Sequence, residues 1–277
     1  MQTIQTLLLK LSVFVYLAIA IIISIGPLLW VFASSFRTNI EILSSDFTYS
    51  NGFAFRNYAR AFDLAPISQF YVNSIIVAIL STVINLIIAA LAAYVLSRFQ
   101  FRGRESIRIL LSLGLLIPSA ALMIPLYITI GEVGLYDNIW GLILAYAGFG
   151  IPISLYILNS YFMTIPKELE ESAYMDGSNF VRTFSLIILP LATPALATAA
   201  VLQFLLSWNE FQIALILTAD NDTRTLPIAL LYFKTQMASD LGAMMAAITV
   251  VTLPSILLFV ALQKQVVAGL VSGAVKG

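Results

Sequence analysis

Charged residues are spaced along this chain so that six long intervals contain none of them. The intervals are Leu11–Phe36, Leu64–Ser97, Ile109–Gly131, Asn138–Pro166, Thr183–Asn209 and Leu241–Gln263. Each is close to or longer than the ~20 residues that an α-helix needs to cross the hydrocarbon core of a bilayer. Composition agrees, because 10% of the 277 residues are charged, whereas about 25% are charged in a typical soluble domain. The sequence therefore predicts an all-α integral membrane protein.

We expect a single transmembrane domain over residues 1–277 with six membrane-spanning helices. The expected spans lie at about 11–36, 70–97, 107–131, 138–162, 184–209 and 241–263, and a polar loop at 164–189 separates the fourth from the fifth. The first span is longer than the apolar region of a signal peptide, and its Gly26-Pro27 break is not followed by a small-x-small cleavage site. We therefore interpret it as a retained helix.

Basic residues in the connections predict the orientation, because cytoplasmic loops carry an excess of Lys and Arg. Six spans place both termini on one side, together with the second and fourth connections. That side carries Lys10, Arg98, Arg102, Arg104, Arg108, Lys167, Arg182, Lys264 and Lys276, and the other carries Arg37, Arg56, Arg60, Arg224 and Lys234. This division of nine against five predicts that the termini and the polar loop are cytoplasmic.

The polar stretch Ile165–Leu189 has a pattern typical of a helix, a turn and a second helix. Pro166 suits the first position of a helix, where its missing N–H costs nothing. The acids that follow gather at the positive end of the helix dipole, and they are Glu168, Glu170 and Glu171. Gly177 is typical of a residue that ends a helix, and Ser178 or Asn179 of the cap that begins the next.

Two roles are open for this amphipathic segment. It can lie on the lipid surface, or it can dock into a groove on a partner protein. In the first case its three glutamates and Asp176 would face an anionic inner leaflet, which disfavours lipid binding. We therefore favour docking to a protein partner.

Polar side chains in or at the ends of the spans are candidates for lining a solute pathway, and they are Asn85, Gln203, Trp208, Asn209 and Glu210. The last three offer an aromatic face, an amide and a carboxylate, the groups that hold carbohydrate-like ligands. Structural alternatives stay open, because Trp marks membrane interfaces and an amide within a span often bonds to a neighbouring helix. Pro118 and Pro125 interrupt the third span, and such breaks occur where protein or a cavity satisfies the freed carbonyls.

The chain has neither cysteine nor histidine. It therefore lacks thiolate chemistry and the commonest metal ligand and general base. It also has no G-x-x-x-x-G-K-[ST] phosphate loop, so ATP bound in that way must be bound by a partner. We predict a non-catalytic subunit that binds no metal and no cofactor of its own.

Several residues of the polar stretch together form a known motif: Glu171-Ser172-Ala173, Asp176-Gly177-Ser178, Phe184, Leu189-Pro190 and Pro194. They resemble the EAA loop of the membrane-spanning subunits of bacterial ATP-binding-cassette importers, which reads EAA, three residues later G, then an aromatic residue and Leu-Pro. Ser172 departs from the pattern, because the family usually has Ala there. The segments Pro27–Arg37, Trp208–Phe211 and Gly269–Gly277 resemble the carbohydrate-uptake (MalG-like) branch of that family.

The resemblance implies that the first helix of the loop is a coupling helix, which docks on an ATPase subunit. The coupling residues it implies are Glu170, Glu171, Ser172, Ala173, Asp176 and Gly177. The implied partners are a second related permease, an extracytoplasmic solute-binding protein, and two ATP-binding-cassette ATPase subunits that bind ATP and Mg. The implied function is ATP-driven uptake of a sugar or related polyhydroxylated solute across the bacterial plasma membrane.

Alternative functions also stay open. One is an importer permease for a solute that is not a sugar, and another is a membrane scaffold without transport. A third is a secondary carrier driven by an ion gradient, which is disfavoured because such carriers keep ionisable groups at mid-membrane. The six expected spans of this chain carry scarcely any charge at mid-membrane.

Overall fold

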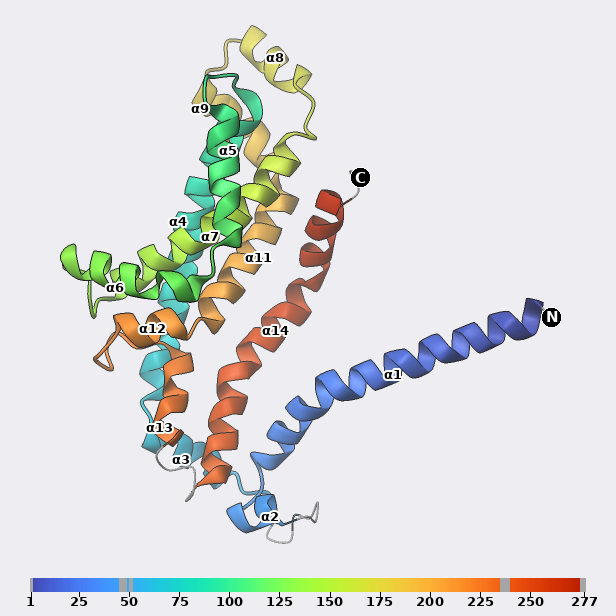
Figure 1. Ribbon diagram of the computed structural model, residues 1–277, viewed down its shortest axis with the longest axis vertical. Helices are drawn as coiled ribbons and strands as arrows, with labels where there is room; N and C mark the ends of the chain where they lie inside the picture. Colours follow the sequence, from blue (N-terminus) through green and yellow to red (C-terminus); the bar gives the residue numbers. More distant parts are fainter. Residues whose placement is uncertain (1, 45–48, 50–51, 235–239, 275–277) are drawn as a thin grey trace. The chain divides into compact units, whose positions relative to one another are not determined.

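The computed structural model describes residues 2–44, 49, 52–234 and 240–274, and within these ranges every regular element is a helix (Figure 1). The chain forms two compact units. One consists of Met1–Ile67 with Ala229–Leu253, and the other of Ser68–Ile228 with Pro254–Gly277. The single domain expected over residues 1–277 stays a prediction. Residues 275–277, at the end of the tail that contributes to the resemblance, lie outside the described residues.

Four helices are long and apolar enough to cross a membrane, and they are Lys10–Ser34, Ile67–Arg98, Ile139–Phe162 and Leu241–Ala261. Two further stretches qualify if a bent pair of helices counts as one span. These pairs are Arg104–Leu116 with Ser119–Glu132, bent by 100°, and Phe180–Leu191 with Thr193–Asn209, bent by 77°. The described residues confirm a helical protein with several apolar spans, whose number lies between four and six.

The first unit is built from α1 (Gln2–Ser34), α2 (Asn39–Leu43), α3 (Arg56–Leu64), α13 (Leu230–Lys234) and the first part of α14 (Leu241–Ala274). Polar contacts join the ends of these helices. The side-chain amide of Asn57 donates to the carbonyls of Ser35 and Arg37, both at 2.9 Å. Asp240 caps the first turn of α14 and pairs with Arg60 at 2.5 Å. The start of α14 is therefore attached to α3.

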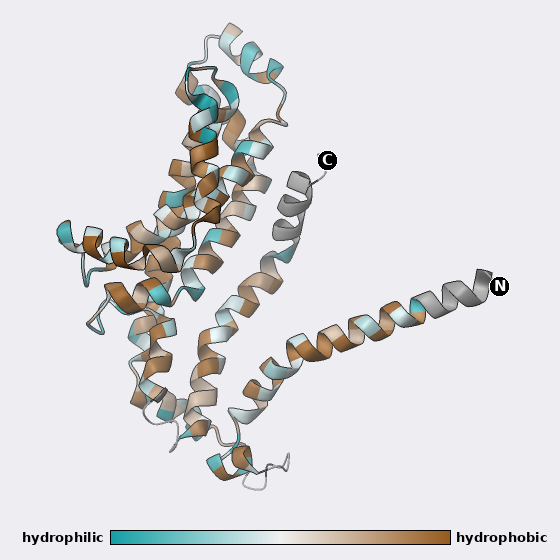
Figure 2. Ribbon diagram, in the orientation of Figure 1, coloured by the Kyte–Doolittle hydropathy of each residue, from teal (hydrophilic) through white to brown (hydrophobic). Residues whose placement is uncertain are grey.

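The second unit contains α4 (Ile67–Arg98), α5 (Arg104–Leu113), α6 (Met123–Glu132), α7 (Ile139–Phe162), α8 (Glu168–Met175), α9 (Phe180–Thr183), α10 (Leu189–Leu191), α11 (Thr193–Asn209) and α12 (Gln212–Leu217). Short 3-10 helices lie at 114–116, 119–122 and 226–229, and a π-helix at 184–188. The core is formed by α4, α7 and the segment 184–199. Ala89, Ala90 and Ala93 of α4 are buried in it, because small side chains let membrane helices approach closely. Figure 2 shows hydrophilic residues in α8, at one end of this largely apolar bundle.

Prolines account for both bent pairs. Pro118 follows an extended residue and separates α5 from α6, whereas Pro125 lies in the first turn of α6 and leaves that helix intact. In the second pair, Pro194 lacks the N–H that would bond the carbonyl of Pro190. The hydroxyl of Thr193 donates to that carbonyl instead, at 2.7 Å. The freed backbone group is thus satisfied, as a membrane interior requires.

Candidate functional site

The polar loop forms the two helices and the turn that its sequence predicts. Helix α8 ends at Met175 and is followed by Gly177 in the left-handed region, at a φ of +79°. The N–H groups of Gly177 and Ser178 donate to the carbonyls of Tyr174 and Ala173, at 3.0 and 2.9 Å. These two bonds make a Schellman turn, in which glycine is strongly preferred. Asn179 then caps α9 by accepting the N–H of Arg182 at 2.9 Å.

One face of α8 is turned toward the body of the second unit. Ala173 and Glu170 are buried, and Ile165 just before the helix joins the apolar core. The Glu170 carboxylate lies 2.6 Å from Arg98 Nε and accepts the hydroxyl of Tyr94 at 2.9 Å. Glu170 therefore faces α4 of its own chain.

The opposite face of α8 is exposed and combines acidic with apolar side chains. Its acids are Glu168, Glu171 and Asp176. Beside them, Leu169 and Tyr174 are about half exposed and Met175 is 88% exposed. Ser172 and Gly177 are exposed as well. Acids around apolar side chains form a surface suited to a groove with a basic rim.

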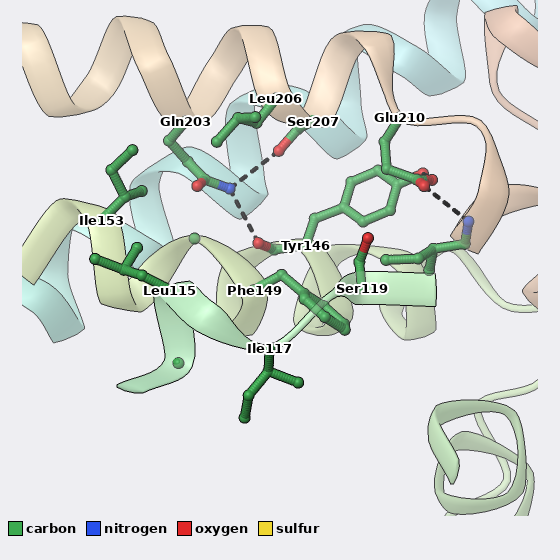
Figure 3. A pocket seen from close by; sticks show the side chains of 13 residues that line it. Leu115, Ile117, Ser119, Tyr146, Phe149, Ile153, Gln203, Leu206, Ser207 and Glu210 are labelled. Carbon is green, nitrogen blue, oxygen red and sulfur yellow. Dashed lines mark hydrogen bonds between the residues drawn. The ribbon is translucent and has the colours of Figure 1, made fainter. Parts of the chain in front are cut away.

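The same unit also contains a cavity of about 310 Å³. It lies between α7, α11 and the segment that joins α5 to α6. Its walls are Gly114, Leu115, Ile117, Ser119, Tyr146, Phe149, Gly150, Ile153, Gln203, Leu206, Ser207, Glu210 and Ile213. Figure 3 shows Gln203 and Ser207 above Tyr146, with Leu115, Ile117 and Ser119 on the other side. Residues of the broken third span, Gly114 to Ser119, thus contribute to the cavity wall, and the pathway role of this span stays a prediction.

Two amides meet beside Gly150: Gln203, which lies in the cavity wall, and Asn85 of α4, which does not. Gln203 Nε2 donates to the Tyr146 carbonyl at 3.0 Å and to Ser207 Oγ at 3.1 Å, and Asn85 Nδ2 donates to the Ala147 carbonyl at 2.8 Å. The oxygen of each amide is buried and has no hydrogen-bond partner among the described residues. Buried polar atoms without partners are costly, and they are common at sites that bind polar ligands or water. The hydrogen bond from Asn85 to a neighbouring helix, which the sequence left open as a structural alternative, is present.

Gly150 makes the close approach of these amides possible. A β-carbon at this position would lie 1.6 Å from Gln203 Oε1 and 2.9 Å from Asn85 Nδ2. Glycine is therefore required for α7 to pack against both amides in this arrangement.

The three consecutive residues Trp208, Asn209 and Glu210 point to different surroundings. Trp208 is buried between Tyr71 and Phe204, with ring centroids 5.5 and 5.8 Å away, and does not line the cavity. Asn209 accepts the hydroxyl of Ser255 at 2.9 Å and also lies outside the cavity wall. Only Glu210 lines it.

The carboxylate of Glu210 is held in place by hydrogen bonds from two helices, α7 and α12. Its Oε2 accepts the hydroxyl of Tyr146 at 2.8 Å, and its Oε1 accepts the N–H of Ile213 at 2.8 Å at the start of α12. The carboxylate thus caps a helix while it lines the cavity. Sequence reasoning missed Tyr146 as its partner, because no spacing in the sequence connects these two residues.

Outside the candidate spans, Asp137 fixes the loop at residues 219–223. Its Oδ1 accepts the N–H groups of Ala219 and Asp220, at 2.8 and 3.1 Å, and the hydroxyl of Thr223 at 2.5 Å. Burial alone would raise the pKa of Asp137, but these hydrogen bonds outweigh it and lower the pKa below its usual value. Asn73 donates to two further carbonyls of this loop. The loop is therefore held firmly.

Comparisons with known proteins bear on this arrangement. A family model described as "Binding-protein-dependent transport system inner membrane component" matches residues 85–271. The trehalose transport system permease protein SugB of Mycobacterium tuberculosis is 38% identical over 91% of this chain and 92% of its own. The diacetylchitobiose uptake system permease protein NgcG of Streptomyces coelicolor is 36% identical over 91% of this chain and 83% of its own.

A solved structure has the same fold. It is the crystal structure of a bacterial ABC transporter involved in the import of the acidic polysaccharide alginate. One of its chains superimposes with a TM-score of 0.80 at 24% identity, over 93% of this chain and 96% of that one.

Proposed function

Because the chain belongs to the family of binding-protein-dependent transport system inner membrane components, we propose that it is a membrane-spanning subunit of an ATP-driven importer. It contributes to a solute pathway and is moved by ATPase subunits that contact α8. The observation that carries this proposal is the exposed acidic and apolar face of α8, at the end of an otherwise apolar bundle. ATP and Mg are bound by those partners.

Each bent pair of helices counts as one span in this proposal, which gives six. The Lys and Arg distribution of nine against five supports a cytoplasmic position for both termini and α8. Helix α8 is therefore accessible to cytoplasmic ATPase subunits. A second related permease completes the pathway, and a solute-binding protein docks on the opposite side of the bacterial plasma membrane.

The solute is a sugar or a related polyhydroxylated molecule. Two relatives carry trehalose and diacetylchitobiose in their names, and both align with nearly the whole chain. The chemistry of the cavity supports this choice, because amide, hydroxyl and carboxylate groups alternate there with apolar ones. A hydroxyl left unpaired in an apolar medium costs about 2–7 kcal/mol. A polar-lined cavity that opens to one side at a time removes this cost.

Reversing the charge of one exposed acid on α8 tests the docking surface. Glu171→Lys should abolish ATP-dependent uptake while the chain remains in the membrane, because the acid would no longer match its partner. Glu132→Lys is the matched control, since Glu132 is an exposed acid at the end of α6, on the side away from the ATPase. Uptake and copurification of the ATPase are measured for both variants. Equal activity of the two would contradict docking through α8.

A panel of solutes offered to the cognate binding protein tests the solute class. Binding of a di- or oligosaccharide at micromolar concentration or tighter supports the sugar assignment. Exclusive binding of an amino acid, a peptide or an inorganic anion would indicate an importer permease for another solute.

A further inference from the structure

Glu170 differs from the other glutamates of α8 because it is the only one turned inward. Arg98 Nε and Glu170 Oε1 are 2.6 Å apart, and the two side chains are 6% and 9% exposed. The second carboxylate oxygen accepts the hydroxyl of Tyr94, a residue 76 positions earlier. The buried carboxylate of Glu170 is thus ion-paired through one oxygen and hydrogen-bonded through the other, in both cases to residues at one end of α4.

Arg98 contacts the polar loop at two places. Besides its ion pair with Glu170, its Nη2 donates to the carbonyl of Ile165 at 2.9 Å. Ile165 lies just before α8, so one guanidinium group holds both the helix and the segment that leads into it. This arrangement restrains the direction of α8 as well as its distance from α4.

The surroundings of the ion pair are aromatic and buried. The ring of Tyr94 is fully buried, and its neighbours are Phe99, Phe162, Phe180 and Phe184, with ring centroids 4.8 to 6.2 Å away. A charge in such surroundings is tolerated only when it is paired and hydrogen-bonded. Separating Arg98 from Glu170 would therefore leave each of them as an unpaired buried charge, which is costly. The pair resists small displacements that an exposed ion pair would allow.

We propose that Arg98, Glu170 and Tyr94 form a joint that makes α8 and α4 move as one body. The proposal rests on the function proposed above, in which a partner displaces α8. With the joint intact, that displacement reaches Asn85, which lies 13 residues before Arg98, or about 20 Å along an α-helix. Glu170 is then a positioning residue for transport, and the ATPase contact belongs to the exposed face of α8.

The chain contains no cysteine, so two introduced cysteines report on the joint without further changes. Ser172→Cys on α8 and Gln100→Cys just after α4 are both exposed, and spin labels on them measure the distance between the helices in the full-length chain without the ATPase, so that the label on α8 meets no partner. We expect a single narrow distance distribution. Glu170→Ala should broaden it, whereas the control Glu168→Ala, which changes an exposed glutamate of the same helix, should leave it unchanged.

Transport supplies a second readout. Glu170→Ala should lower the amount of solute carried per ATP hydrolysed by a factor of about 2 to 30, while the ATPase still copurifies. Arg98→Ala should lower the solute carried per ATP to a similar extent. The double variant Arg98→Ala with Glu170→Ala should transport no less than either single variant, because each of the three variants removes the same joint. Tyr94→Phe keeps the aromatic packing and removes one hydrogen bond, so it should give a smaller change in the same direction.

The outcomes separate the joint from the proposed function. An unchanged distance distribution and an unchanged transport ratio in Glu170→Ala would overturn the joint. If Glu170→Ala does not assemble, Tyr94→Phe decides in the same way, with a broader distribution supporting the joint and an unaltered one overturning it. A wild-type complex that hydrolyses ATP without any uptake would instead contradict the proposed function.

Discussion

Replacing Gly150 by alanine should disturb the two amides beside the cavity. The new β-carbon would lie 1.6 Å from Gln203 Oε1, so the amide must move. In moving it loses its hydrogen bonds to the Tyr146 carbonyl and to Ser207, now 3.0 and 3.1 Å long. Such bonds within membranes contribute about 0.6 kcal/mol each on average and about 1.7 at most. We therefore expect a cost of about 1–3 kcal/mol.

Gly148→Ala is the matched control, because a β-carbon on Gly148 meets nothing within 4 Å. Both substitutions gain the same helix propensity, about 1 kcal/mol, and the difference between the two variants cancels it. Unfolding in mixed micelles with increasing SDS gives both free energies. A Gln203→Ala background gives a second test, because without that side chain the cost at Gly150 should nearly vanish. Equal stability of the two glycine variants, or a cost that persists in the Gln203→Ala background, would refute the reasoning.

Three other predictions concern separate parts of the molecule. Trp208→Ala should cost about 3–5 kcal/mol in the same unfolding assay and leave solute preference unchanged, because Trp208 packs between rings outside the cavity wall; a changed solute preference with full stability would contradict this. The pKa of Asp137 is lowered in the folded chain, so its stabilisation of residues 219–223 should be present above the ordinary aspartate pKa of about 3.9 and be lost as the pH falls through the lowered value. Hydrogen exchange at the Ala219 and Asp220 amides measures this, and Asp137→Asn should remove the acid dependence. Gly177→Val should reduce uptake, because a left-handed φ of +79° costs a β-branched residue about 1–2 kcal/mol; Gly134→Val, at a φ of +72° outside the loop, carries the same strain and should leave ATPase coupling intact.

Local features of the candidate site could be predicted from the sequence. The end of α8 at Gly177 and the cap at Asn179 depend on residues within a few positions of one another. The apolar spans follow from stretches of twenty or more residues without charge. In both cases the interactions that determine the structure lie within one short segment of the chain.

The direction of Glu170 could not be predicted in the same way. Glu168, Glu170 and Glu171 have the same chemistry, and the choice of which one turns inward depends on Arg98 and Tyr94, which lie on another helix. Nor does the start of the helix follow from its proline, because α8 begins at Glu168, two residues after Pro166. If α8 were rotated about its axis by one residue, a different side chain would face the core.

The same reason limits prediction of the cavity. Trp208 and Asn209 are the last residues of α11, where successive side chains point in directions about 100° apart, and Glu210 follows them in an extended conformation. Only Glu210 lies in the cavity wall. Gly150 and Gln203 meet because α7 packs against α11 there, which depends on the breaks at Pro118 and Pro194 and on the packing of the whole unit.

Uptake by a reconstituted complex tests the central claim most directly. The chain is placed in liposomes with its second permease and the ATPase subunits, and labelled sugar is supplied with the binding protein on the outside. We predict uptake that requires ATP inside and binding protein outside, and that is lost in Glu171→Lys. Uptake by this chain alone, driven by an ion gradient and indifferent to ATP, would contradict the account.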